Sequence, residues 1–77
     1  MIQVTTSDIW TPRVVGKPHD TLRHALECAK RSVRRDRSPH DIWLTNEDGE
    51  RRVLLAYVKP GEAVLTNSGH TLAERVG

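Results

Sequence analysis

The sequence has one cysteine, no phenylalanine, only three other aromatic residues and no long hydrophobic run. A single cysteine excludes an intrachain disulfide and leaves too few thiolates for a cysteine-based zinc site. No apolar stretch approaches the roughly 20 residues that cross a bilayer, and the first ten residues lack the basic start and apolar block of a secretory signal. We therefore expect a cytoplasmic protein that contacts no membrane.

Length and composition are those of one small globular domain. The 77 residues are 36% hydrophobic and 29% charged, and no linker divides residues 1–77. A domain of this size buries only about 60% of the surface of its unfolded chain, so its stability is marginal. We expect a single domain that would gain stability from covering apolar surface with a partner.

The N-terminal part predicts a β-hairpin. Residues 2–6 alternate apolar and polar side chains, Ser7-Asp8 is a turn pair, and residues 9–15 are again rich in strand formers. Pro12 cannot donate a ladder hydrogen bond, so the second strand is expected at an edge of the sheet or as an irregular strand. Residues 16–18, Gly-Lys-Pro, are expected to end it.

A helix is predicted from residue 21 to about residue 37. Its N-terminus can be capped by Asp20 or Thr21, and Ser38-Pro39 ends it because the residue before proline avoids the α region. Its apolar residues follow helical spacing and form one stripe. They are Leu22, Ala25, Leu26, Ala29 and Val33.

The sequence IWLTNEDGERRVLLAYV, residues 42–58, predicts a second hairpin with strands at 41–46 and 50–58 and Gly49 in the turn. Residues 63–66 offer a short fifth strand, and Asn67-Ser68-Gly69 a further turn. The expected fold is α+β, a small antiparallel sheet built in the order β-β-α-β-β with one helix packed on one face.

Both faces of the second hairpin carry apolar side chains, and one helix can cover only one of them. Strict alternation places Ile42, Leu44, Leu54, Ala56 and Val58 on one face. Leaving several such side chains exposed costs several kcal/mol at about 25 cal/mol per Å². Either the rest of the chain covers the second face, or that face is an interface with another protein or a second copy. The candidate interface residues are Trp43, Val53, Leu55 and Tyr57.

Positive charge is concentrated in the predicted helix. Residues 23–37 hold six cations and two carboxylates, a net charge of +4, although the whole chain carries only +2. Glu27 is expected to neutralise part of this charge through ion pairs with Arg23 and Arg31. Nucleic-acid binding is the alternative function, although aromatic residues for stacking are few. Its candidate residues are Lys30, Arg31, Arg34 and Arg35, which Arg51 and Arg52 would extend if they lay on the same side.

The residues suited to chemistry form no recognisable site. His24 and Cys28 are four residues apart, but two ligands do not make a metal site, so we expect Cys28 beside the core and His24 at the surface. Residues 67–70, Asn-Ser-Gly-His, include types used in nucleophilic catalysis, yet these types also make turns. We therefore expect no enzyme activity, no cofactor, no metal and no small-molecule substrate.

Residues 21–29 have the pattern Thr-Leu-x-x-Ala-Leu-Glu-x-Ala. This helix start, between one hairpin and the next, resembles that of small phage-encoded host-takeover proteins, which include short α+β inhibitors of bacterial RNA polymerase. The resemblance implies a noncatalytic protein that acts in the host cytoplasm by docking on a host protein. The second hairpin and the C-terminal residues depart from that pattern, so no binding residue of the family is transferred.

Together these patterns predict a noncatalytic interaction module of phage origin that binds a host protein or its own copy. Trp43 and Tyr57 would form the apolar anchor, because large aromatic residues dominate binding energy at protein interfaces. Arginines around them would steer the encounter.

Overall fold

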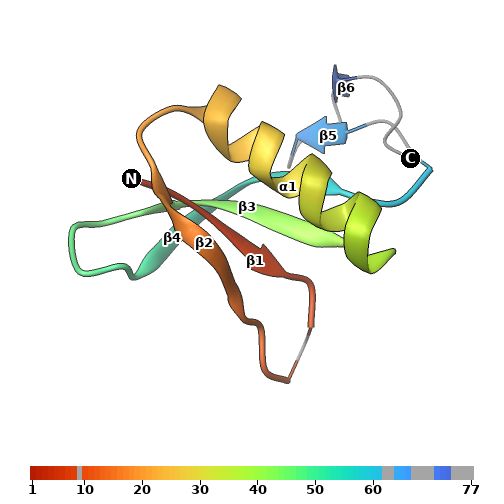
Figure 1. Ribbon diagram of the computed structural model, residues 1–77. Coiled ribbons are helices and arrows are strands. Elements are labelled where there is room, and N and C mark those ends of the chain that lie inside the picture. Colours follow the sequence, from red (N-terminus) through yellow and green to blue (C-terminus); the bar gives the residue numbers. More distant parts are fainter. Residues whose placement is uncertain (9, 62–63, 67–70, 74–77) are drawn as a thin grey trace.

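The computed structural model describes residues 1–8, 10–61, 64–66 and 71–73, without the side chains of residues 52 and 71–73. One helix and six strands form the described chain (Figure 1). The strands form one antiparallel sheet in the order β2-β1-β3-β4-β5-β6. The elements are β1 Ile2–Thr6, β2 Val14–His19, α1 Leu22–Asp36, β3 His40–Thr45, β4 Arg51–Val58, β5 Val64–Thr66 and β6 Thr71–Ala73.

The predicted α+β fold is confirmed, with one helix against an antiparallel sheet. The helix, the second hairpin and the short fifth strand lie within about two residues of their predicted bounds. Strand β6 was not predicted, since its three residues, TLA, are too short for a visible alternation. The turn predicted at 67–69 lies outside the described residues.

The second strand is at an edge, as predicted, but its predicted bounds of 9–15 are wrong. Strand β2 instead contains the Gly-Lys-Pro segment that was expected to end it. Gly16 has a φ of +71°, which accommodates the shift in register between β1 and β2. Pro18 is tolerated because an edge strand leaves every other N–H without a sheet partner.

Helix α1 is capped at both ends. The Oγ1 of Thr21 accepts a hydrogen bond from the His24 N–H at 3.2 Å, which selects one of the two predicted caps. At the other end the Arg37 N–H donates to the Val33 carbonyl oxygen at 2.8 Å, and the φ of Arg37 is +57°. In the described part of the chain no helix is long and apolar enough to span a membrane.

Arg37 has the left-handed backbone conformation that glycine adopts at least cost. Replacing Arg37 by glycine is expected to raise the free energy of unfolding by about 0.5–1 kcal/mol, measured by urea denaturation. Arg34→Gly is the matched control, because it removes the same side chain from a helical position and should lower stability by about 1 kcal/mol. A loss of stability in Arg37→Gly would contradict the assigned cap.

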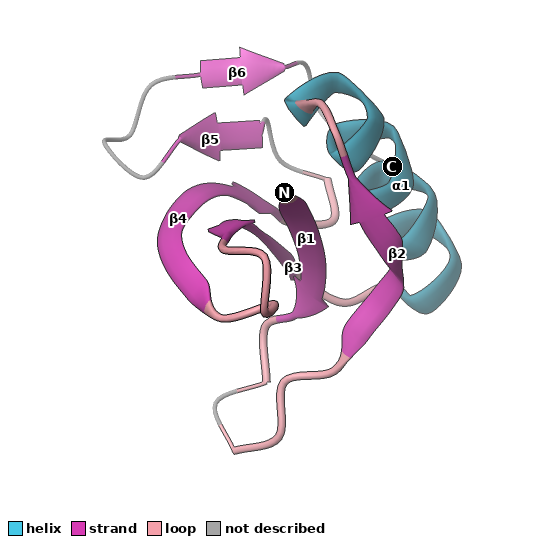
Figure 2. Cartoon of the chain, turned by 90° about the vertical axis from the view of Figure 1, so that its left-hand side faces the viewer, coloured by secondary structure: helices cyan, strands magenta, loops and turns pink. Residues whose placement is uncertain are grey.

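The core lies between α1 and one face of the sheet. Small helix residues, Ala25 and Ala29, let the helix approach the strands closely, and both are fully buried. Figure 2 shows β4 bending so that the sheet curls around the side on which the helix lies. The buried hydrophobic residues are Ile2, Val4, Ala25, Ala29, Val33, Ile42, Ala56, Val58 and Val64.

Candidate protein-interaction surface

A bulge in β4 changes which hairpin residues share a face. Ile42 pairs with Ala56, whereas its neighbour Trp43 pairs with Leu54, so the register skips Leu55. Residues directly opposite one another in an antiparallel pair point to the same side. Leu54 therefore shares the face of Trp43 and not that of Ile42, contrary to strict alternation. Leu55 packs against the core.

A second shift of register lies nearer the turn. Leu44 pairs with Val53, and Thr45 pairs with Arg51. Val53 consequently joins Leu44 on the helix side of the sheet, where both are exposed because the hairpin extends beyond the helix (Figure 1). Two of the four candidate residues thus leave the predicted face. The prediction that Trp43, Val53, Leu55 and Tyr57 share one face is wrong for Val53 and Leu55.

The side of the sheet opposite the helix, here called the outer face, carries one row of side chains across five strands. Each member of the row pairs with the next, from β2 through β1, β3 and β4 to β5. The row consists of Val14, Thr5, Asp41, Tyr57 and Leu65. Trp43, Leu54 and Arg51 also lie on the outer face, as do Gln3 and Thr45, which pair with Trp43 and Arg51.

The chain covers part of this face itself. The Trp43 indole N–H donates to the Thr5 Oγ1 at 3.1 Å, and Thr5 is fully buried. The guanidinium of Arg51 lies over the Trp43 ring at 5.9 Å from its centroid. Trp43 is therefore half-buried, whereas Tyr57 and Leu65 keep 36% and 40% of their surface exposed.

A cavity lies beside the middle of the row, where Asp41 and Tyr57 meet the chain before β3. Its volume is about 270 Å³, and the Ser7 hydroxyl donates to the Asp41 Oδ1 at 2.8 Å within it. Burial raises the pKa of the Asp41 carboxyl, while the hydrogen bond from Ser7 opposes that effect. The lining residues are Ser7, Pro39, His40, Asp41, Tyr57 and Lys59.

The raised pKa of Asp41 predicts a pH dependence of stability. The folded chain binds the Asp41 proton more tightly than the unfolded chain does. Protonation of Asp41 therefore stabilises the fold fully at pH values below the ordinary carboxyl pKa. This stabilisation is lost as pH rises through the raised pKa of the folded state. Asp41→Asn should therefore gain stability relative to the native chain over that pH range, measured by urea denaturation.

Asp36→Asn is the control for this prediction, because hydrogen bonding from Arg35 lowers the pKa of Asp36. Stability from Asp36 is present above the ordinary carboxyl pKa and lost as pH falls through its lowered pKa. The two variants should thus show opposite pH trends relative to the native chain. The same trend in both would contradict the assigned burial of Asp41.

Trp10 is an exposed aromatic residue that sequence reasoning did not select as a site. It lies between β1 and β2 with 89% of its surface exposed. The Asp8 Oδ1 accepts the Trp10 N–H at 2.9 Å, and the two carboxylate oxygens also accept hydrogen bonds from Thr11. These backbone hydrogen bonds lower the pKa of Asp8. Trp10 follows the Ser7-Asp8 turn pair by two residues, a position typical of an exposed loop. The strand predicted over residues 9–15 included it.

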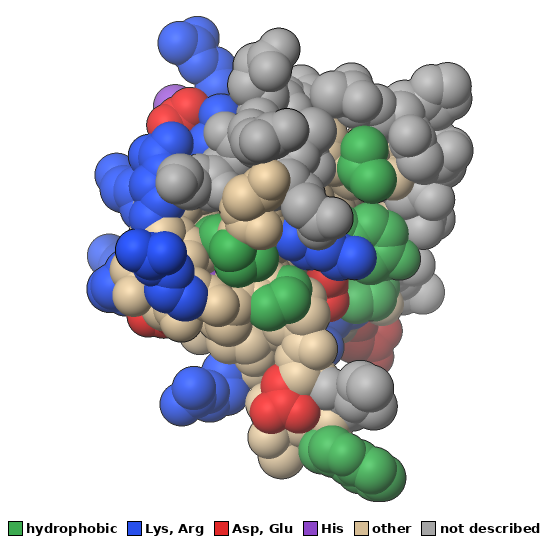
Figure 3. Space-filling view, turned by 90° about the vertical axis from the view of Figure 1, so that its right-hand side faces the viewer, with side chains coloured by type: hydrophobic (Ala, Val, Ile, Leu, Met, Phe, Trp, Pro, Cys, Tyr) green, Lys and Arg blue, Asp and Glu red, His purple; other side chains and the backbone are tan. Residues whose placement is uncertain are grey.

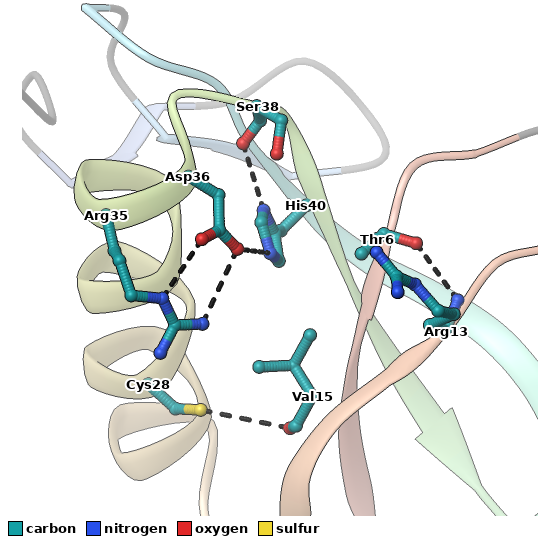
Figure 4. Close-up of polar contacts among 8 residues, drawn as sticks. All are labelled: Thr6, Arg13, Val15, Cys28, Arg35, Asp36, Ser38 and His40. Atoms are coloured by element: carbon teal, nitrogen blue, oxygen red, sulfur yellow. Dashed lines mark hydrogen bonds and ion pairs between the residues drawn. The ribbon is translucent and has the colours of Figure 1, made fainter.

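The basic residues of α1 lie on the side away from the sheet. Figure 3 shows most of the visible Lys and Arg side chains on one side of the molecule, whereas hydrophobic side chains lie from its centre toward the other side, with a further basic side chain among them. Arg35 hydrogen-bonds Asp36 at 3.0 Å (Figure 4), and within the described ranges Glu27 forms none of its predicted ion pairs. Arg51 lies on the outer face and does not extend the helix cations. Of the four candidates, Arg31, Arg34 and Arg35 are exposed and Lys30 is half-buried.

The expected positions of His24 and Cys28 are confirmed. His24 is exposed, whereas Cys28 packs against the core, with its Sγ 4.0 Å from the Val15 carbonyl oxygen (Figure 4). Among the described residues no group of three or more His, Cys, Asp and Glu side chains is arranged to hold a metal ion. Residues 67–70 lie outside the described residues.

His40 is a fully buried titratable residue beside the end of α1 (Figure 4). Its Nδ1 lies 2.9 Å from the Ser38 carbonyl oxygen, so this nitrogen carries the proton that the carbonyl accepts. The Nε2 lies 4.0 Å from an Asp36 Oδ2 and has no hydrogen-bond partner. These contacts join the helix end to the start of β3 and leave the outer face to other residues.

Comparison with known proteins gives no matching family model, no similar curated protein and no similar solved structure. The likeness of residues 21–29 to phage host-takeover proteins stays a prediction. Any function must therefore follow from the geometry of the chain itself.

Proposed function

We propose that this protein is a noncatalytic interaction module of phage origin. It docks through its outer face on a protein of the host cell. The observation that carries the proposal is the exposure of Tyr57 and Leu65 on the same face of the sheet as half-buried Trp43. Thr5 and one carboxylate oxygen of Asp41 are engaged in structural hydrogen bonds, with Trp43 and Ser7 respectively, which supports docking over catalysis.

Charge at the edges of the outer face also supports docking. Arg51 stacks on Trp43 near the hairpin turn, and Lys59 follows β4 at the opposite end of that strand. Cations at the rim of an apolar patch accelerate encounter with a partner of complementary charge. Arginine and tryptophan are also enriched among the residues that dominate binding energy.

The size of the outer face indicates that a partner also contacts residues beyond it. Five strands spaced about 4.8 Å apart and strand segments of about 18 Å give a footprint of roughly 350 Å². A stable interface buries about 800 Å² on each partner. Docking through the outer face alone therefore falls short, whether the partner is a second copy or another protein. A larger partner could also contact Trp10, whose loop begins at Ser7 beside the cavity.

Photo-crosslinking tests the proposal. The photoreactive residue p-benzoylphenylalanine at position 57 should form adducts with a discrete partner in bacterial lysate, because Tyr57 lies in the outer face. The same residue at position 44 is the control, since Leu44 is 40% exposed on the helix side. Equal adducts at both positions, or none at position 57, would argue against docking. Adducts of the chain with itself would identify self-association.

Nucleic-acid binding by α1 is the second candidate function. It is supported by the exposure of Arg31 and Arg34 on α1. It is weakened by the pairing of Arg35 with Asp36 and by the position of Arg51 on the opposite face. If the helix binds nucleic acid, its affinity for duplex DNA should fall steeply between 50 and 200 mM salt. A protein that makes ~6 phosphate contacts loses about a thousandfold in affinity over that range. A flat response would exclude this function.

A further inference from the structure

We propose that the cavity beside Asp41 receives a lysine or arginine side chain of the docked partner, with its cationic group on the Asp41 carboxylate. This inference rests on the proposed docking function and specifies the partner's chemistry at one point of the outer face. The cavity lies beside the middle of the cross-strand row and is lined by Asp41 and Tyr57, so a partner lying on Tyr57 can reach it.

One oxygen of the Asp41 carboxylate can still accept a hydrogen bond in this cavity. Ser7 donates to Oδ1 at 2.8 Å, but none of the described residues donates a hydrogen bond to Oδ2. Asp41 is half-buried, and covering its Oδ2 without supplying a donor would be costly, so a partner that brings a donor to this oxygen would be favoured. Ammonium and guanidinium groups are the strong donors for a carboxylate.

The walls of the cavity suit the aliphatic part of such a side chain. Pro39 and the Tyr57 ring supply apolar surface, and the volume of about 270 Å³ is several times the ~30 Å³ that one water occupies. Lysine and arginine bury their methylene stems on apolar surface and keep the charged head on a polar partner. A guanidinium would in addition stack on the Tyr57 ring.

The surrounding charges leave Asp41 unneutralised. Lys59 lines the cavity, but it is exposed and forms no ion pair with Asp41 within 4.0 Å. Arg51 and His40 lower the pKa of Asp41 by less than burial raises it. A partner cation would supply the missing charge and would favour the ionised carboxylate.

The test uses the whole chain and small capped amino acids. N-acetyl-arginine methylamide is titrated at pH 7 while the amide signals of Ser7, Asp41 and Tyr57 are followed by ¹⁵N NMR. Saturating shifts are expected, with affinity at least fivefold weaker for the neutral citrulline analogue and for the Asp41→Asn variant. Lys59→Gln should strengthen binding, because it removes the nearest like charge from the cavity.

Two outcomes would overturn the inference. One is equal binding of the arginine and citrulline probes. The other is tighter binding of a third probe, N-acetyl-glutamate methylamide, which would make the cavity an anion site served by Lys59. If Asp41→Asn fails to fold, the native chain is used at a pH below the Asp41 pKa, where the carboxyl group is protonated and neutral. Binding of the arginine probe must then be weaker than at pH 7.

The test separates this inference from the proposed function. Cross-linking at position 57 without a preference for arginine would keep docking and remove the cation site. Arginine-specific binding without any cross-linked partner would support the cation site and remove the docking function.

Discussion

Replacing Ile42 by alanine is expected to lower the free energy of unfolding by about 3 kcal/mol. Ile42 is fully buried at the centre of β3, between β1 and β4 and under the helix. The substitution removes three carbon groups and leaves a cavity, and such changes cost about 2–5 kcal/mol. A domain of this length has roughly 4–12 kcal/mol of stability, so the loss is a large share of the total.

Thermal denaturation measures this effect, because each kcal/mol shifts the Tm of a domain this small by about 4–8 °C. Leu44→Ala is the control. Leu44 lies two residues further along β3 on the same side, but it is 40% exposed and outside the core, so its loss should cost about 1 kcal/mol. Equal losses in the two variants would contradict the position of the helix over Ile42.

Replacing both Tyr57 and Leu65 by serine should weaken partner binding by at least a hundredfold. An aromatic anchor such as Tyr57 contributes about 2 kcal/mol or more, burial of the exposed part of Leu65 adds about 1 kcal/mol, and about 1.4 kcal/mol is a factor of ten. Because both side chains are already partly exposed, the double variant should lose little stability. Affinity is measured by calorimetry with the partner identified by cross-linking.

The double variant Leu44→Ser with Val53→Ser is the matched control for this measurement. These residues pair across β3 and β4 and are 40% and 47% exposed, but they lie on the helix side. The number of cross-strand apolar side chains removed is therefore the same, and affinity should change by less than threefold. A comparable loss in the two double variants would mean that general surface hydrophobicity, and not the outer face, determines binding.

Helix α1 and the hairpin of β3 and β4 could be predicted because local signals agree there. The apolar stripe from Leu22 to Val33 has helical spacing, and Thr21 and Ser38-Pro39 mark its ends. The turn before Gly49 separates two runs of strand formers. Strand β2 could not be placed from local signals, because a glycine and a proline that usually interrupt strands are tolerated at a bulged edge.

The outer face was only partly predictable, because bulges shift the register between β3 and β4. The presence of apolar residues on both faces of the hairpin was readable from the sequence, and Trp43 and Tyr57 do share the outer face. Bulges at residues 55 and 52 invert the alternation locally, and no residue of the RRVLLAYV strand signals them. Asp41 and Leu65 belong to the outer face because of the pairing between β3, β4 and β5, which a single sequence does not reveal.

The most direct test of the account measures which side chains of the isolated chain contact solvent. In NMR spectra with a soluble paramagnetic gadolinium complex, recorded at decreasing protein concentration, signals of Tyr57 and Leu65 should be strongly broadened, while those of Ile42 and Val58 stay sharp. Protection of Tyr57 and Leu65 at the lowest concentration would contradict the account, because the chain itself would then cover its outer face.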